Sequence, residues 1–101
     1  MESMRDSVKY TDSREINNPG KLNYKDGFLY ISETEKGIHI IDNRNINNPV
    51  NIGFIVLPGN YDIATKGDYL YADSYLDLVV FDIFNINSVK EVNRLENNFE
   101  N

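Results

Sequence analysis

An internal repeat is the feature that most constrains how this chain folds. Each copy contains an aromatic run, an apolar run ending in Asp, and an Asn-rich linker, in that order. These blocks are 25–32, 37–42 and 45–49 in the first copy, and 66–73, 77–82 and 85–89 in the second. A partial third echo lies at 16–19. The period of about 40 residues is typical of propeller blades and similar arrays.

Each copy has the pattern of short β-strands. The runs at 28–31 and 69–72 are aromatic and lie next to Asp-Gly or Gly-Asp turn signals. The runs at 38–41 and 78–81 are continuously apolar, which predicts strands buried on both faces. Three further strands are expected, at 51–57, 61–66 and 90–95. The only helical candidate is the first dozen residues.

We therefore predict an all-β fold of two four-stranded antiparallel sheets, each resembling a propeller blade. Residues 1–16 would form a partly ordered extension, 17–57 the first repeat and 58–101 the second. A blade normally has neighbours on both faces, so two blades leave two apolar faces open. Three outcomes follow: the chain self-associates, its N-terminal residues cover a face, or it is a fragment. We expect self-association.

Composition excludes several function classes. The net charge is −6, whereas binding to nucleic acid or an anionic membrane requires clustered Lys and Arg. The absence of cysteine excludes disulfides, thiolate metal sites and cysteine nucleophiles. No apolar run follows the N-terminal charges, so no secretory signal is predicted. No stretch approaches the length of a membrane span.

The apolar block ending in Asp and the linker after it resemble the LVIVD repeat. The matching residues are 37–42, 47–50, 73–74 and 78–82, and the resemblance covers 16–99. It implies a β-propeller of such blades, as found in uncharacterised bacterial surface proteins and lipoproteins without assigned catalysis. It also implies a location at the cell surface or outside the cell. The chain holds about two repeats, fewer than a closed ring requires.

Three residues of the apolar blocks are candidates for chemistry. His39 is the only histidine and aligns with Val79, so we expect a buried structural side chain. Asp42 and Asp82 end equivalent apolar strands. We predict that each accepts a hydrogen bond from a backbone amide two or three residues on, which fixes the turn into the linker.

Acidic residues gather in the second copy, at Asp62, Asp68, Asp73 and Asp77. A bound cation would use Asp62, Asp73 and Asp77, but their spacing matches no calcium loop. We therefore expect solvated turn residues, with no metal site and no cofactor. Tyr75 lies in a predicted turn and is the candidate for a binding surface.

These features predict a non-enzymatic module that assembles with other copies or binds a protein or glycan. One alternative is a truncated fragment without an independent role. Another is a metal-assisted hydrolase subunit that uses the Asp group of the second repeat. The sequence offers no paired base and nucleophile, so we predict no catalytic residues.

Overall fold

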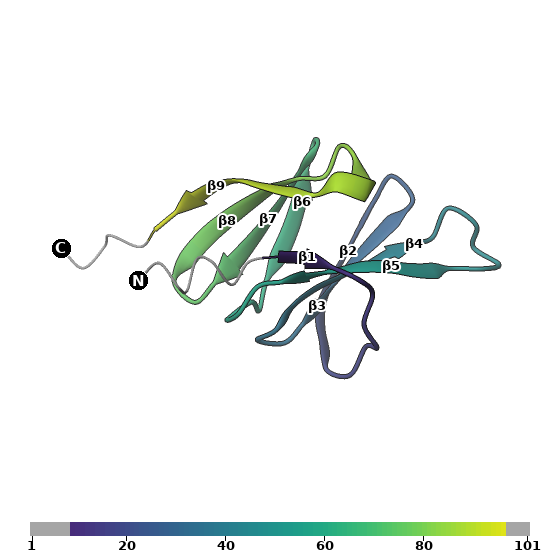
Figure 1. The fold of residues 1–101 in the computed structure, drawn as a ribbon, viewed down its shortest axis with the longest axis horizontal. Helices are drawn as coiled ribbons and strands as arrows, with labels where there is room; N and C mark the ends of the chain where they lie inside the picture. Colours follow the sequence, from purple (N-terminus) through teal and green to yellow (C-terminus); the bar gives the residue numbers. More distant parts are fainter. Residues whose placement is uncertain (1–8, 97–101) are drawn as a thin grey trace.

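The computed structural model describes residues 9–96, which form two antiparallel sheets (Figure 1). The first sheet has the strand order β1-β5-β4-β3-β2, and the second has the order β6-β7-β8-β9. The strands are β1 (Lys9–Thr11), β2 (Pro19–Lys25), β3 (Phe28–Glu33), β4 (Gly37–Asp42), β5 (Val50–Val56), β6 (Ile63–Lys66), β7 (Tyr69–Ser74), β8 (Asp77–Asp82) and β9 (Lys90–Leu95). A short 3-10 helix, η1 (Ile86–Ser88), precedes β9.

The predicted all-β class and the two antiparallel sheets are confirmed, but the strand count of the first sheet is wrong. That sheet has five strands because β1 pairs with the outer strand β5, with Tyr10 opposite Ile55. Within the predicted extension 1–16, residues 9–11 are therefore strand, and residues 1–8 lie outside the described part. The helical candidate in the first dozen residues is wrong for 9–11, which are strand, and its first eight residues lie outside the described part. The assignment to propeller blades stays a prediction.

The two repeats share their local geometry. Phe28 pairs with Asp42 in the first sheet, as Tyr69 pairs with Asp82 in the second. The apolar strands β4 and β8 each have a register shift at the same position, after Ile40 and after Val80. The repeated blocks therefore specify the same hairpin and the same bulge twice.

The turns after the apolar strands are fixed as predicted. Asp42 accepts a hydrogen bond from the Arg44 amide at 3.1 Å, and Asp82 accepts one from the Phe84 amide at 2.9 Å. In each linker an Asn side chain then accepts from the amide two residues on, at 3.1 Å in both copies. The structural role predicted for Asp42 and Asp82 is confirmed.

The sheets stack face to face around one hydrophobic core. The first sheet contributes Tyr30, Ile38 and Ile40, while the second contributes Leu70, Val79 and Phe81. These two sets are not equivalent in the repeat. Each core residue of the second sheet is shifted by one position from the equivalent of the first-sheet residue. Because successive side chains of a strand point to opposite faces, the two sheets use opposite faces for the core.

We call the face of Tyr30, Ile38 and Ile40, and its equivalent with Tyr71, Leu78 and Val80, the front face. The other face of each sheet is the back face. The front face of the first sheet packs on the back face of the second. The stacking is thus head to tail, as in a tandem array.

Polar contacts also join the sheets. Strand β2 lies beside β6, where the Thr65 hydroxyl donates to the Asn23 side chain. The Tyr10 hydroxyl of β1 donates to the Ile86 carbonyl at 3.2 Å. At the crossover between the sheets, the buried Asn60 accepts from the Ser32 hydroxyl at 2.7 Å and donates to the Asp73 carbonyl at 3.0 Å.

Candidate functional site

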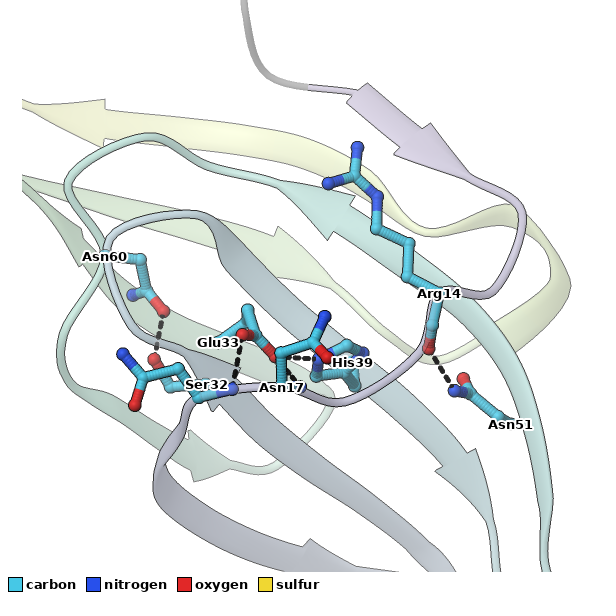
Figure 2. A network of polar contacts seen from close by, with 8 residues as sticks. Arg14, Asn17, Ser32, Glu33, His39, Asn51 and Asn60 are labelled. Carbon is cyan, nitrogen blue, oxygen red and sulfur yellow. Dashed lines mark hydrogen bonds and ion pairs between the residues drawn. The ribbon is translucent and has the colours of Figure 1, made fainter.

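The back face of the first sheet is covered by residues 12–18, which we call the strap. The strap joins β1 to β2 and passes over the strands between them (Figure 2). The Arg14 guanidinium lies 4.3 Å from the centre of the Phe54 ring, and Phe54 is fully buried. The Arg14 carbonyl accepts from the Asn51 side chain at 2.6 Å. The strap therefore takes the position that a neighbouring sheet would otherwise occupy.

A buried acid–histidine pair lies beneath the strap. The Glu33 carboxylate accepts from the Asn17 amide at 3.1 Å and from the Asn18 amide at 2.6 Å. The same carboxylate lies 2.7 Å from His39 Nε2, and the His39 ring contacts Phe54 edge to face. Figure 2 shows Glu33 between Asn17 of the strap and His39 of β4. Glu33 thus accepts hydrogen bonds from two strap amides, and His39 contacts the same carboxylate from the other strand.

The environment of Glu33 favours its charged form. Burial alone raises the pKa of the carboxyl, but the hydrogen bonds from His39, Asn17 and Asn18 outweigh burial, so the pKa lies below its usual value. His39 is fully buried, as its alignment with Val79 predicts. Its Nδ1 atom is buried and has no hydrogen-bond partner among residues 9–96. Glu33, held by His39, therefore binds the strap to the back face of the first sheet.

Within residues 9–96, no segment covers the front face of the second sheet in the same way. We call it the open face, and its apolar members are Tyr69, Tyr71, Leu78, Val80, Val92 and Leu95. Leu78 is 36% exposed, whereas the equivalent Ile38 of the first sheet is 0% exposed. Leu95 is 55% exposed, and its equivalent Ile55 is 1% exposed. Tyr69 and Val92 are exposed as well, while Tyr71 is partly buried and Val80 is buried between them.

The open face is also hollowed and polarised. Two shallow hollows of about 420 and 220 Å³ adjoin Tyr71 and Leu78, which line both. The strand register places Lys66 and Lys90 at one end of the face, in a row with Tyr69 and Asp82. Asp62 and Asp73 lie at the other end, where they line the smaller hollow.

Asp62, Asp73 and Asp77, the candidate cation ligands, each make local structural contacts. Asp73 accepts from the Tyr61 amide at 2.7 Å and from the Asp62 amide at 3.0 Å. Asp62 accepts from the Ile63 amide, and Asp77 pairs with the almost buried Arg94 at 2.7 Å. Within residues 9–96, no three His, Cys, Asp or Glu side chains gather in a way that could hold a metal ion.

Tyr75 lies in the turn between β7 and β8 and not on the open face. Its φ is 59°, its side chain is exposed, and its amide donates to the Gly59 carbonyl at 3.0 Å. The neighbouring Tyr61 donates to the Glu35 carboxylate, and this bond raises the pKa of the Tyr61 hydroxyl. Tyr75 thus lies beside the crossover between the sheets.

A cleft of about 450 Å³ opens between the sheets at the end that holds the two linkers. Phe28, Tyr30 and Phe84 supply its aromatic lining. Its cations are already paired, Arg44 with Asp42 at 2.7 Å and Lys25 with Asp26 at 2.9 Å. Burial, with the nearby Tyr10 and Asp26, raises the pKa of Tyr30 to about 12. The Tyr30 hydroxyl makes no hydrogen bond within residues 9–96.

Comparison with known proteins gives no relative: no family model, no curated protein and no solved structure matches the chain. The resemblance to the LVIVD repeat therefore stays a prediction. In the described part of the chain, no helix has the length and apolar character needed to cross a membrane.

Proposed function

We propose that this chain is a non-enzymatic assembly module that associates through its open face with a second copy. One observation carries the proposal: Ile38 and Ile55 are buried on the front face of the first sheet, whereas their apolar equivalents Leu78 and Leu95 are exposed on the second. A contiguous exposed apolar patch on a folded protein is typical of an interaction site. The open face thus has the apolar composition of a surface that packs against a partner.

The sheet edges support association by the face and not by strand pairing. Outer edges that carry charge, Pro or Lys resist addition of another strand. Strand β9 carries Lys90, Glu91 and Arg94, and β2 carries Pro19 and Lys21. The other two edge strands are short: β1 has three residues, and β6 has four and ends in Lys66.

The solution mass tests the proposal. We expect the purified chain to associate reversibly as its concentration rises, as measured by size-exclusion chromatography with light scattering. Leu78→Glu, on the open face, should abolish association because it places a charge in an apolar contact. Leu22→Glu is the matched control, since Leu22 is exposed on β2 and outside the open face. A monomer at every concentration would refute the proposal.

The cleft favours a second candidate function, the binding of a small neutral hydroxylated ligand such as a sugar. Its aromatic lining offers stacking surfaces, and the free Tyr30 hydroxyl offers a donor. Because both nearby cations are already paired with Asp side chains, an anionic ligand gains little.

Amide chemical shifts would test this second function. Methyl glucoside and N-acetylglucosamine should shift the amides of residues 83–86, and Phe84→Ala should remove the effect. Tyr75→Ala, at the other end of the molecule, is the control and should bind as the parent chain does. Shifts that persist unchanged in Phe84→Ala would refute the cleft as the site.

The predicted surface location and propeller membership rest on the resemblance of the repeat alone. A hydrolase that uses the Asp group is less favoured, since Asp62, Asp73 and Asp77 already serve local contacts. Calcium or zinc that leaves the melting temperature unchanged would count further against it.

A further inference from the structure

The following inference rests on the proposed function and concerns the symmetry of the assembly. We infer that two copies meet open face to open face in a closed two-fold dimer, and that the strap prevents growth into a ring. Closed two-fold dimers place the same patch of both copies in contact, whereas head-to-tail contacts continue into rings or filaments.

The strap decides between these modes. Within the chain, the front face of the first sheet packs on the back face of the second. If copies assembled into a ring in the same way, the open face of one copy would pack on the back face of the first sheet of the next copy. That back face is already occupied by Arg14 on Phe54 and by the strap amides on Glu33. Displacing the strap would leave Glu33 buried without those donors, which is costly.

What remains uncovered on the strap side is small. Leu22 and Tyr24 are exposed on β2, beside the strap. They form a two-residue strip on an edge strand, whereas the apolar members of the open face lie on the three strands β7, β8 and β9. Of the two outer sheet faces in the described part of the chain, the open face therefore offers a second copy more exposed apolar side chains.

The charges of the open face set the orientation of the pair. If the two-fold axis runs across the strands, the Lys end of one copy meets the Asp end of the other. Lys66 then lies near Asp62 of the second copy, and the reverse contact occurs at the other end of the interface. An axis along the strands would instead place Lys66 and Lys90 of both copies together, which is repulsive.

The size of the face predicts a weak dimer. Four strands about 4.8 Å apart and about 20 Å long present a face of about 400 Å². Stable interfaces bury about 800 Å² on each partner. We therefore expect a dimer in reversible exchange with monomer.

A charge exchange tests the symmetry. Lys66→Glu alone, or Asp62→Lys alone, should raise the dimer Kd about tenfold, because two-fold symmetry places each substitution in the interface twice. An equimolar mixture of the two variants should recover a Kd within about threefold of the parent value, since every contact pairs opposite charges again. The double variant Lys66→Glu/Asp62→Lys should recover it also. Leu22→Glu is the control and should leave the Kd unchanged.

The possible outcomes distinguish failure of the proposed assembly from failure of the two-fold symmetry. If the parent chain never associates, the proposed function fails. If it associates but forms trimers or larger closed species, or if the mixture does not recover the Kd, the module survives and the two-fold arrangement fails. If Leu22→Glu blocks association, the strap side is the interface and the inference is wrong.

Discussion

The two sheets are copies of one repeat, and they differ most where their neighbours differ. The back face of the second sheet packs on apolar side chains of the first and has Val79 and Ser74. The equivalent residues of the first sheet are His39 and Glu33, which lie under the strap. A strap presents backbone amides, so the face beneath it requires acceptors that a sheet-facing surface does not.

Strand pairing inside each hairpin, by contrast, is equivalent in both copies, although the loop at its tip has three residues in the first and two in the second. Asp42 and Asp82 make equivalent turns, and the bulges after Ile40 and Val80 coincide. The two copies therefore have equivalent residues where these determine the sheet itself. They have different residues on the face that packs against a strap in one copy and against a sheet in the other.

The largest difference should appear on the front faces. Ile38→Ala should lower the free energy of unfolding by about 3–4 kcal/mol because it opens a cavity in the core. Leu78→Ala, at the equivalent exposed position, should cost about 1 kcal/mol or less in the monomer. Urea denaturation at low protein concentration measures both. Equal losses would contradict the open face.

Removing the acceptor beneath the strap should have the next largest effect. Glu33→Ala should cost about 2–3 kcal/mol, since it leaves two strap amides and His39 without their acceptor. Ser74→Ala is the equivalent change in the second sheet and removes one neutral hydrogen bond, to Pro58, worth about 1 kcal/mol. The order of the two losses, measured by urea denaturation, is the test, and the reverse order would contradict the role of Glu33.

Acid should loosen the strap before the rest of the first sheet. Because the pKa of Glu33 is lowered by folding, its stabilising effect is complete above the unfolded value of about 4.3 and is lost as the pH falls through the lower folded value. Hydrogen exchange at residues 17 and 18 should therefore be less protected below about pH 4, after correction for intrinsic rates. In Glu33→Gln this pH dependence should disappear, and its persistence would assign the effect to another group.

The smallest effect concerns the two cation–ring contacts. Arg14→Ala should cost about 1 kcal/mol by removing the guanidinium from Phe54. Arg44→Ala removes the longer contact with Phe28 at 5.0 Å together with the exposed ion pair to Asp42, and it should also have a small effect. Thermal melts measure both, and an Arg14→Ala variant that melts as the parent chain does would refute the role of Arg14 as an anchor of the strap.

Much of the fold follows from the sequence because the determining signals are local. The turn residues, the apolar runs at 38–41 and 78–81, and the Asp at the end of each predict the hairpins directly. The strand β1 was not predictable in the same way. Lys9–Thr11 is short and polar, and it is a strand only because β5 offers an unpaired edge.

The site was harder to predict because it depends on contacts distant in sequence. Nothing local places residues 12–18 over Phe54, or Asn17 on Glu33. One signal was present: His39 and Glu33 depart from Val79 and Ser74 at positions that the repeat makes equivalent. A polar departure at a buried repeat position indicates that the face has a different cover.

The most direct test of the account is a dilution series followed by methyl NMR. The methyl signals of Leu78, Val80 and Val92 on the open face should shift with protein concentration. Those of Leu29 and Ile41, on the face crossed by the strap, should stay unchanged. Concentration-dependent shifts at Leu29 and Ile41, with none at Leu78, would show that the strap side is the free face and would contradict the account.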